Sequence, residues 1–491
     1  MPNYLSPGVY IEELNDFPSS VAQVETAIPA FVGYTEKAQL NDSDLINRPY
    51  AVHSLAEFEQ IFGTYCTEQF DWCNSSSNCT AMVTIDSQHY YLVQTQPVYL
   101  LYKSIKLYFQ NGGKRCYVVS VGNYQRPISK EDLITGINLL LNESEPSLLV
   151  LPDAVSLEHS QCAEVQSTMI AHCGTHTQNR VAILDVQQAG SLSLSVQQFS
   201  NNFTGHIAND YAAAYYPWLV TQALPSSAIG LDNFSIRARQ RLADLLRPKS
   251  KTPNARLLKA ISALDSPKQS KRTDLIIDNI LRANSKAYLQ ILGALKTAVN
   301  TLPPSGAVTG AMVNNDETRG IWKAPANIAL NNVDTVTASI SAQQQDELNG
   351  HPYGPSINGI KNFSGRGTLI WGARTLDRGN TEYQYLNIRR SAIMIQCSVQ
   401  NLLKSYVFEP NDENTWAIVL SATNHFLTTL WRSGAFAGTK SEQAFAVRIG
   451  LRETMTTQDI TNGIMRLSIA FAMVRPAEFI LLNVEQKMQN P

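Results

Sequence analysis

The chain has 491 residues, of which 44% are hydrophobic and only 16% are charged, and its formal net charge is −2. This length corresponds to about three domains. The charged fraction lies below the ~25% of typical globular proteins, which indicates large cores or much surface hidden in an assembly. A net charge near zero gives no overall attraction to nucleic acid or to an acidic membrane.

The cysteines and the apolar runs argue against a secreted disulfide scaffold and against a membrane protein. The seven cysteines are Cys66, Cys73, Cys79, Cys116, Cys162, Cys173 and Cys397. Their odd number, in a chain large enough to fold without disulfides, favours reduced thiols and cytosolic synthesis. Met1–Ser20 carries acids and prolines instead of a basic start and an apolar stretch, so we expect no secretory signal. Runs such as Ile469–Val474 are far shorter than the ~20 residues that span a bilayer.

The first part of the chain alternates apolar runs with polar connections. The runs predict strands at Ile28–Tyr34 and Cys116–Val121 and helices at Ala56–Phe62 and Tyr99–Gln110. Cys66–Thr84 is polar and rich in Ser and Asn, which predicts a surface loop. Its three cysteines include no C-x-x-C pair, so free loop thiols are the leading interpretation and a zinc site is the alternative.

A strand, a helix and a second strand follow from Leu148 onwards. The expected helix is Ala163–His172 and the second strand is Val181–Val186, which together predict a parallel βαβ unit. No glycine-rich fingerprint follows either strand, so the backbone that would cradle a phosphate is missing. Asp153 and Asp185 end the two strands, where catalytic acids often lie, although capping and turn roles are commoner.

A cluster of possible metal ligands surrounds the end of this helix. It consists of His159, Cys162, His172, Cys173 and His176. The alternative to a metal site is an ordinary helix C-terminus, where the helix dipole favours His and a Cys packs as a small apolar group.

The segment Arg237–Arg272 is strongly basic. Eleven Lys and Arg residues against two Asp give it a net charge of +9, which leaves about −11 for the rest of the chain. Three prolines interrupt it, so it cannot be one helix. It contains almost no aromatic residues for base recognition. We therefore expect a solvated insert, or one that faces an acidic neighbour, and no contact with nucleic acid.

A predicted helix and a turn-rich stretch follow the insert. Ser285–Asn300 has Ser285 as a capping residue. Its apolar stripe, at helical spacing, is Tyr288, Ile291, Leu292, Leu295 and Val299. Leu302–Asn327 is rich in Gly and Pro, and we interpret it as a connection between two parts of the chain, with Trp322 packed on a core.

The C-terminal part has the clearest periodicity. After Gly365–Gly367 we expect a strand at Thr368–Trp371 and a helix at Arg389–Tyr406. A second helix is expected between a cap at Asn411 and a stop at Gly434. Its apolar face is Trp416, Val419, Leu420, Leu427, Leu430 and Trp431. Alternating apolar residues predict strands around Phe445–Ile449, Leu467–Met473 and Ile480–Val484.

The sequence offers no credible active site. Gly434–Lys440 looks like a phosphate-binding loop, but three residues instead of four separate its glycines, and Lys440 follows Thr439. No nucleophile elbow, zinc-protease motif or calcium loop is present. We expect no catalytic residues, no cofactor and no metal.

Several motifs together resemble the family of contractile tail sheath proteins of phage tails and phage-derived injection systems. They are YLSPGVYIEE, NGGKRCYVVSVG, AAAYYPWL, PPSGAVTGAMVNNDETRGIWKAPAN, NIRR, VFEPNDENTW, FLTTLWRSGAFAG, TTQDITNG and VRPAEFI. The residues that carry the family signature are Pro303, Pro304, Gly306, Arg319, Gly320, Trp322, Lys323 and Pro325. The long basic insert departs from the shortest sheath proteins and is similar to insertions in sheaths of extracellular injection systems.

The resemblance implies a structural subunit that polymerises around an inner tube and contracts without nucleotide hydrolysis. It implies an α+β fold, in which a C-terminal core of helices on a small mixed sheet is completed by terminal arms from neighbours. An inserted α/β outer domain would accompany this core. The N-terminal arm strand would be Val9, Tyr10, Ile11, Glu12 and Glu13. The C-terminal arm strand would be Phe479, Ile480, Leu481, Leu482, Asn483 and Val484.

The same resemblance divides the chain and names its partners. The expected parts are an arm (1–20), an outer domain (21–302) with the insert at about 225–302, a joint (303–360), a core (361–477) and a second arm (478–491). Partners would be many copies of the chain itself, the inner tube, the baseplate and a terminator or cap protein. The chain would be made in the bacterial cytoplasm and act in a released or virion-like particle. Alternatives are a phage tail sheath, a static tube or baseplate scaffold, and an enzyme built on the βαβ unit.

Overall fold

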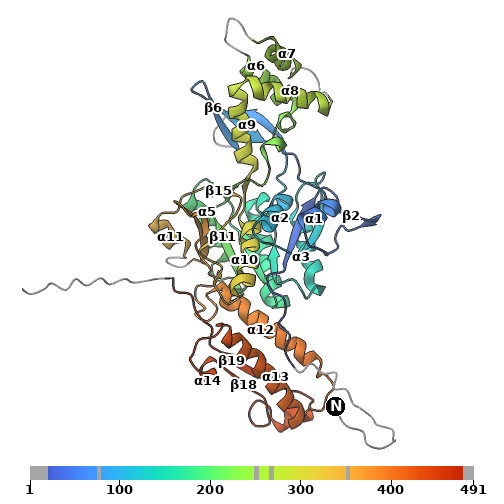
Figure 1. Cartoon of the computed structure of the whole chain (residues 1–491), viewed down its shortest axis with the longest axis vertical. Coiled ribbons are helices and arrows are strands. Elements are labelled where there is room, and N and C mark those ends of the chain that lie inside the picture. Colours follow the sequence, from blue (N-terminus) through green and yellow to red (C-terminus); the bar gives the residue numbers. More distant parts are fainter. Residues whose placement is uncertain (1–19, 75–78, 248–253, 265–269, 350–353, 479–491) are drawn as a thin grey trace, which may run out of the picture. The chain divides into compact units, whose positions relative to one another are not determined.

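The computed structural model of the chain describes residues 20–74, 79–247, 254–264, 270–349 and 354–478. Its contacts divide the chain into two units. The larger unit is Glu25–Arg390, and the smaller unit combines Met1–Val24 with Ser391–Pro491. Helix α12 (Leu386–Lys404) begins in the larger unit and ends in the smaller one. In Figure 1 the helices of the smaller unit are orange and red.

A mixed sheet forms the core of the larger unit. Within the described residues it has nine strands in the order β14-β17-β16-β11-β10-β9-β1-β8-β4. Their bounds are β1 Pro29–Thr35, β4 Tyr50–Val52, β8 Cys116–Asn123, β9 Leu148–Val150, β10 Val181–Asp185, β11 Ala212–Tyr216, β14 Ile328–Ala329, β16 Ile357–Phe363 and β17 Gly367–Ile370. The run from β8 to β16 is parallel, β4 and β17 join its two ends antiparallel, and β14 pairs antiparallel with β17. Every residue of β1, β10 and β11 is buried, as in parallel sheets covered on both faces.

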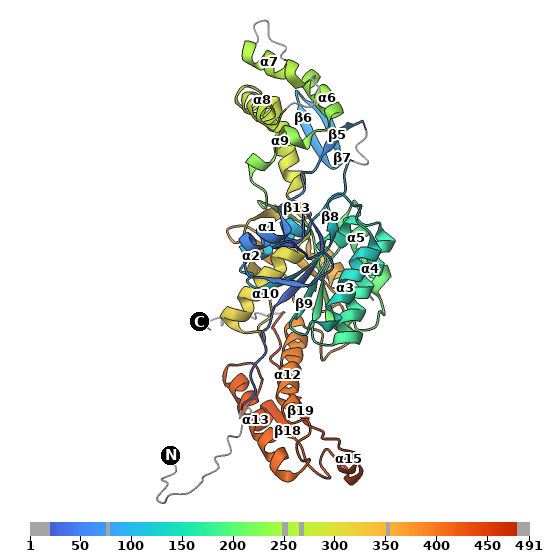
Figure 2. The same cartoon turned by 90° about the vertical axis from the view of Figure 1, so that its right-hand side faces the viewer.

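Helices cover both faces of this sheet. They are α1 Leu55–Phe62, α2 Leu101–Gln110, α3 Lys130–Leu139, α4 His159–Ala171, α5 Leu192–Phe203, α10 Ser305–Arg319 and α11 Ala342–Leu348. Figure 2 shows α1, α2 and α10 on one side of the strands and α3, α4 and α5 on the other. The predicted parallel βαβ unit is confirmed, because β9 and β10 pair in parallel around α4.

A lobe that we call the basic lobe combines the insert with an earlier part of the chain. Its strands are β5 Phe70–Cys73, β6 Ala81–Ile85 and β7 Gln88–Gln94, and its helices are α6 Ile236–Leu246, α7 Ala255–Leu264, α8 Lys271–Asn284 and α9 Lys286–Val299. The surface loop predicted over Cys66–Thr84 is therefore wrong for β5 and β6, because alternate residues of β6 are buried. The stripe predicted on α9 is confirmed, and Ser285 accepts the amide of Tyr288 as its cap.

Short strands complete the larger unit. A small sheet joins β13 (Thr301–Leu302), β12 (Leu219–Thr221) and β15 (Val333–Val336). A separate hairpin pairs β2 (Gln39–Leu40) with β3 (Ser43–Asp44). The boundary expected at residue 361 falls inside β16. Residues 361–390 belong to the larger unit.

The smaller unit packs helices on a short antiparallel ladder. Besides the end of α12 it contains α13 Glu413–Arg432, α14 Ser441–Ala444, β18 Phe445–Arg448, α15 Thr457–Thr461 and β19 Ser468–Phe471. Trp416, Val419, Leu427 and Leu430 of α13 are buried, as predicted, whereas Leu420 and Trp431 are half-buried.

The ends of α13 test the predicted caps. The prediction of Asn411 as the N-cap is wrong by one residue, because Asp412 accepts the amide of Thr415. Asn411 instead accepts the indole N–H of Trp416. At the other end Gly434 has φ +85°, the left-handed conformation expected of a helix stop.

Candidate functional site

The two arms predicted to join neighbouring copies, Val9–Glu13 and Phe479–Val484, lie outside the described residues. The described residues next to the first arm are held on α12. The amide of Val24 donates to Ser398 Oγ at 3.0 Å, and that hydroxyl donates to the carbonyl of Met394. The chain that leads to the N-terminal arm is therefore fixed to the smaller unit at Val24.

The ladder of β18 and β19 is the sheet of the smaller unit. The strands pair from Phe445 with Phe471 to Arg448 with Ser468. Phe445, Val447, Ile469 and Phe471 are half-buried, and the residues between them are exposed. Residues 435–437 pair with the continuation of β19 through the Phe436–Met473 bridge, on the side that faces β18. In the part of the chain that the structure describes, neither outer edge of the ladder pairs with another strand. A hairpin alone is marginally stable, so such edges favour the addition of further strands.

The register of this ladder defines which backbone groups face outwards. The amide of Ala472 donates to the carbonyl of Ala444 at 2.8 Å, which makes these two residues a hydrogen-bonded pair. Antiparallel pairs alternate between hydrogen-bonded and non-hydrogen-bonded positions. The amides of Val447 and Ile469 therefore point away from each other, towards the two outer edges.

The signature segment forms a buried helix, and the turn-rich connection predicted for it is wrong over Ser305–Arg319. Pro303 and Pro304 precede α10, with Pro304 at the capping position. Residues 305–313 are all buried. A Cβ on Gly306 would lie 2.3 Å from the carbonyl oxygen of Ser104, and one on Gly310 would lie 2.3 Å from that of Tyr108. The glycines thus let α10 touch the backbone of α2 (Figure 2).

The end of the signature segment closes over α10 and reaches α12. Gly320 ends the helix with φ +89°, and a Cβ there would lie 2.4 Å from the Trp322 ring. The carbonyl of Trp322 accepts the amide side chain of Asn387 at 2.8 Å. The carbonyl of Lys323 accepts the side-chain NH₂ group of Asn315 at 2.9 Å. The guanidinium of Arg319 donates to Asn315 Oδ1 at 3.4 Å. Trp322 is half-buried, and Pro325 is buried.

Two buried arginines near the start of α12, Arg389 and Arg390, hold the beginning of this helix in the larger unit. Arg390 donates to both carboxylate oxygens of Asp316, at 3.1 and 2.6 Å, and these side chains are only 3% and 4% exposed. Thr26 donates to the same carboxylate at 2.9 Å. Because the chain passes between the units at Val24–Glu25 and Arg390–Ser391, this cluster lies beside both crossings. We call it the α12 anchor.

The neighbouring arginine makes a second set of contacts. Arg389 pairs with Asp210, and its guanidinium lies 3.5 Å from the ring centre of Tyr383 and 4.2 Å from that of Tyr211. Burial lowers the pKa of Arg389 to about 10, which still leaves it charged at neutral pH. Sequence reasoning noted the NIRR and NNDETR motifs but could not pair them, since 74 residues separate Asp316 from Arg390.

The two strand-end carboxylates cap helices and strands. Asp153 accepts the amide of Tyr34 through one oxygen, at 2.8 Å. Its other oxygen accepts the amides of Leu100 and Leu101 at the start of α2, at 2.6 and 3.1 Å. Asp185 accepts the amide of Ser305 at the start of α10, at 2.8 Å. Burial raises the pKa of Asp153 to about 6 and that of Asp185 to about 7.

Among the His and Cys residues near the end of α4, His172 and His159 make separate contacts. His172 begins a π-helical turn, His172–Thr177, and is buried with its Nε2 3.3 Å from a nitrogen of Arg180. Burial, and then the positive charge of Arg180, lower the pKa of His172 to about 4. His159 contacts Gln187 and Asn202 on the surface instead.

The described residues offer neither a metal-binding cluster nor a membrane-spanning helix. Across residues 20–478, outside the four internal gaps, no group of three or more His, Cys, Asp or Glu side chains is placed to hold a metal ion. The helices of the same residues include none that is long and apolar enough to cross a membrane. Gly434–Lys440 follows α13 rather than a strand, and Lys440 precedes α14 on the surface.

Comparison with known proteins gives matches in sequence and in structure. Residues 379–487 match the family model of the phage tail sheath C-terminal domain. The tail sheath protein of Salmonella phage ViI is 27% identical over 137 residues, and that of Vibrio phage KVP40 is 24% identical over 132 residues. These stretches cover 27% and 26% of this chain, but only 21% and 19% of the phage proteins, about a fifth of their length.

Two solved structures match nearly the whole chain. The helical sheath of the anti-feeding prophage (AFP) in its contracted state is 25% identical, with a TM-score of 0.62 and coverage of 99% of this chain and 100% of that one. The sheath complex of an extracellular contractile injection system, PVC, in its contracted state is 24% identical, with a TM-score of 0.62 and 99% of both chains covered. The predicted mixed α and β fold is thereby confirmed, and the resemblance found in the motifs is confirmed by sequence and by structure.

Proposed function

We propose that this chain, which carries a phage tail sheath C-terminal domain and has the fold of contractile sheath proteins, is the structural subunit of a contractile sheath. The observation that carries the proposal is the β18–β19 ladder. Both outer edges of this ladder are unpaired in the described residues, and the described residues nearest to the two ends of the chain, 20–24 and 391–478, belong to the same unit. A neighbour's arm can add to such an edge through main-chain hydrogen bonds.

Strand addition between copies produces a filament. One copy offers arms and the next offers edges, so the contact is head-to-tail and does not close on a pair. The half-buried apolar residues of β18 and β19 would be covered when further strands complete the sheet. Main-chain couplings of this kind can persist while the units that they connect rotate.

The α12 anchor extends this proposal to the larger unit. A force exerted on the smaller unit reaches the larger one through the two crossings of the chain. The buried pair of Arg390 and Asp316, together with Thr26, holds the larger unit's side of both crossings. We therefore assign to the anchor the role of moving the larger unit with the lattice.

The remaining partners follow from the same proposal. The sheath would surround an inner tube and end at a baseplate and at a terminator or cap protein. Contraction would release free energy stored in a kinetically trapped extended form, without nucleotide and without catalysis. The similarity to the AFP and PVC sheaths over 99% of this chain favours an injection system over a phage tail.

Deletion of Met1–Asn15 tests the proposal, because it removes the N-terminal arm strand. We expect the shortened chain to remain folded and to form no sheaths in negative-stain electron micrographs. A chain that lacks only Met1–Asn3 keeps Val9–Glu13 and serves as the control, which we expect to form sheaths of normal length. Sheaths of normal length from the longer deletion would contradict strand exchange. A filament with one state only, never short and wide, would indicate a static scaffold.

A further inference from the structure

The basic lobe neutralises its buried charges internally. Asp274 accepts two bonds from Arg239, at 3.0 and 2.9 Å. Asp278 pairs with Arg282 at 2.5 Å and also accepts the hydroxyl of Tyr288. These pairs consume two of the lobe's arginines, and the exposed cations of the described lobe still outnumber its exposed acids Asp86, Asp232 and Asp244.

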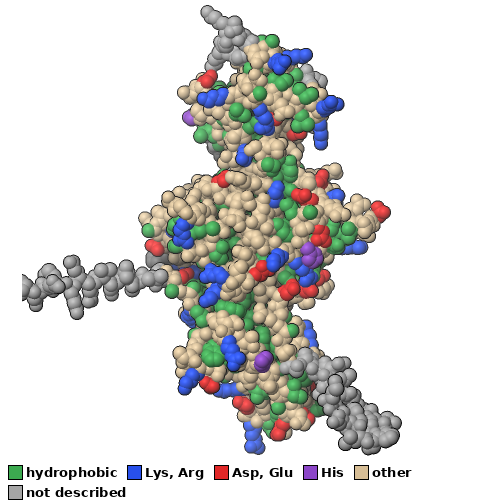
Figure 3. All heavy atoms as spheres, in the orientation of Figure 1, with side chains coloured by type: hydrophobic (Ala, Val, Ile, Leu, Met, Phe, Trp, Pro, Cys, Tyr) green, Lys and Arg blue, Asp and Glu red, His purple; other side chains and the backbone are tan. Residues whose placement is uncertain are grey.

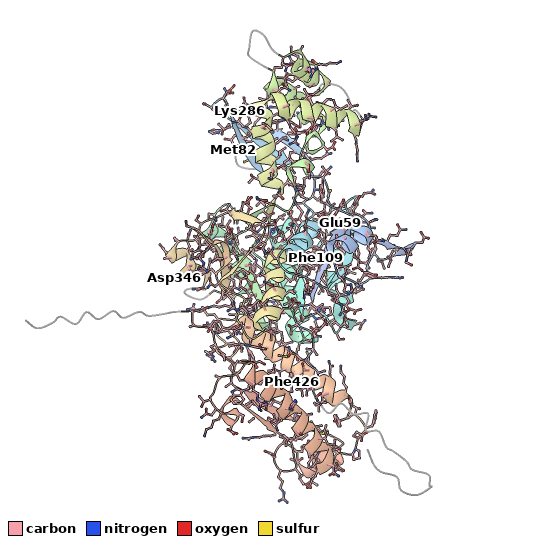
Figure 4. The ribbon with its side chains drawn as sticks, in the orientation of Figure 1. Glu59, Met82, Phe109, Lys286, Asp346 and Phe426 are labelled. Carbon is pink, nitrogen blue, oxygen red and sulfur yellow. The ribbon has the colours of Figure 1, made fainter. Side chains whose placement is uncertain are left out.

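Arg247 pairs with Asp244 at 3.7 Å, whereas six other exposed cations of the lobe have no acidic partner in the described residues. They are Arg237, Arg256, Lys259, Lys271, Arg272 and Lys286, and none of them lies within ion-pair distance of a carboxylate in the described part of the chain. On α8, Leu275 and Ile276 are 64% and 54% exposed next to two of these cations. Figure 3 shows the blue and green side chains of the lobe together, and Figure 4 labels Lys286.

Uncompensated acids occupy another surface of the same unit. They are Glu36, Asp42, Asp44, Glu57 and Glu59, on the β2–β3 hairpin, the segment before it and α1, and we call them the acidic hairpin surface. None of them pairs with a Lys or Arg among the residues that the structure describes; His53 lies 3.5 Å from Glu57, and the exposed cations Lys37 and Arg48 flank the hairpin, so acids remain in excess. Figure 4 labels Glu59 on α1. The acids beside α3 and α4 differ, because Arg115 pairs with Glu145 and Lys130 pairs with Glu164.

The turn of this hairpin exposes its acids. Asn41 and Asp42 have φ +44° and +65°, as in the tight turns that connect two-stranded hairpins. Both Asp42 and Asp44 are exposed. The hairpin therefore offers negative charge on a short backbone that two strands hold in place.

We infer that the basic lobe of one copy docks on the acidic hairpin surface of a second copy in the sheath. This contact extends the proposed function, on which it rests, by a second interface in addition to the arms. Every copy carries both surfaces, so the contact is head-to-tail and repeats along a lattice. Complementary charges set the register of such a contact and exclude wrong pairings. Helices α6–α9 of the lobe contain one aromatic residue, Tyr288, which is buried, so these basic helices offer no stacking surface of the kind that nucleic-acid-binding proteins use.

Charge reversal with rescue tests the inference. The first variant of the full chain carries Arg256→Glu, Lys259→Glu, Lys271→Glu and Arg272→Glu, and the second carries Asp42→Lys and Asp44→Lys. The third combines both sets, so that opposite charges face each other again. The control carries Arg256→Lys, Lys259→Arg, Lys271→Arg and Arg272→Lys, which preserve charge. Circular dichroism and thermal unfolding establish that each variant is folded.

The readout is the amount of sheath that sediments across a range of NaCl concentrations. We expect the lobe reversal to lower it about 10-fold or more at low salt, and the combined variant to recover most of the loss. For the unmodified chain, the amount of sedimented sheath should fall as the NaCl concentration rises, because salt screens the contact. The charge-preserving control should show the same dependence on salt as the unmodified chain.

Three results would overturn the inference. The lobe reversal could leave assembly and its salt dependence unchanged, or the combined variant could fail to recover. The lobe reversal could also leave assembly intact while abolishing binding to vesicles that contain anionic lipid, which would assign the lobe to a membrane surface. The proposed function is tested separately, because deletion of Met1–Asn15 would abolish sheaths even if charge reversal had no effect.

Discussion

Helix α10 lies in the signature segment and the β18–β19 ladder lies within residues 379–487, which match the phage tail sheath C-terminal domain, but the two are built in opposite ways. Residues 305–313 of α10 are all buried, and its glycines touch the backbone of α2. The ladder is only half-buried, and its outer edges are unpaired in the described residues. The helix completes the interior of one subunit, whereas the ladder is a surface that another copy can complete. The two regions that resemble the sheath family therefore differ in packing, and the following changes separate them.

Gly306→Val should cause the largest loss of stability. Its Cβ would lie 2.3 Å from a backbone oxygen of α2, which cannot move without displacing that helix. We expect the free energy of unfolding to fall by about 4 kcal/mol or more. Gly293→Ala is the matched control, because Gly293 also lies in a helix but has nothing within 4 Å of its Cβ position. It should be neutral or stabilise the protein by up to about 1 kcal/mol. Equal losses in chemical unfolding would contradict the packing argument for α10.

His172 should make the interior of the larger unit sensitive to acid. Its pKa is lowered from 6.5 to about 4, so the neutral form is favoured in the folded state. Stability is therefore present above pH 6.5 and is lost as the pH falls towards 4, when protonation would place a second cation beside Arg180. Relative to His172→Gln, the protein should lose about 3 kcal/mol between pH 7 and pH 4. Parallel pH profiles of the two proteins in chemical unfolding would contradict this.

The two buried aspartates should respond differently to conversion to Asn. Asp153 accepts amides through both oxygens, so an Asn side chain would point an NH₂ group at a backbone N–H. We expect Asp153→Asn to cost about 2 kcal/mol. The amide of Ser305 binds a single oxygen of Asp185, and an Asn oxygen can replace it, so Asp185→Asn should cost less than about 1 kcal/mol. A catalytic role for either residue would instead require an activity that these variants lose.

Prolines on the outer edges of the ladder should have the smallest effect on the fold. The amides of Val447 and Ile469 point outwards, so Val447→Pro or Ile469→Pro should change the free energy of unfolding by less than about 1 kcal/mol. At least one of the two should nevertheless prevent sheath formation, because it removes a donor for an added strand. Ala446→Pro is the control, since its amide belongs to the ladder and its loss should destabilise the folded chain. Normal sheaths from both edge variants would contradict the proposed use of the edges.

The local pattern of the chain predicted some elements well. The stripe of α9 from Tyr288 to Val299 and the run Val181–Val186 were predictable, because each element buries residues that its own periodicity marks. Asp412 caps α13, whereas Asn411 was predicted to do so. Residue preference alone cannot distinguish the two positions, since Asp and Asn are both good N-caps.

Other features depend on tertiary packing that the local pattern does not contain. Gly306 and Gly310 indicated turns by composition, yet their spacing of four residues serves close contact with α2. The pairing of Arg390 with Asp316 joins segments far apart in the chain, so neither motif alone revealed the α12 anchor.

A reconstruction of the assembled sheath by electron cryomicroscopy tests the central claim most directly. It would reveal which chains lie beside β18 and β19. We expect Val9–Glu13 of one neighbouring copy and Phe479–Val484 of another to extend the ladder on its outer edges. Arms that pair within their own copy, or edges that remain unpaired in the assembled sheath, would contradict the account.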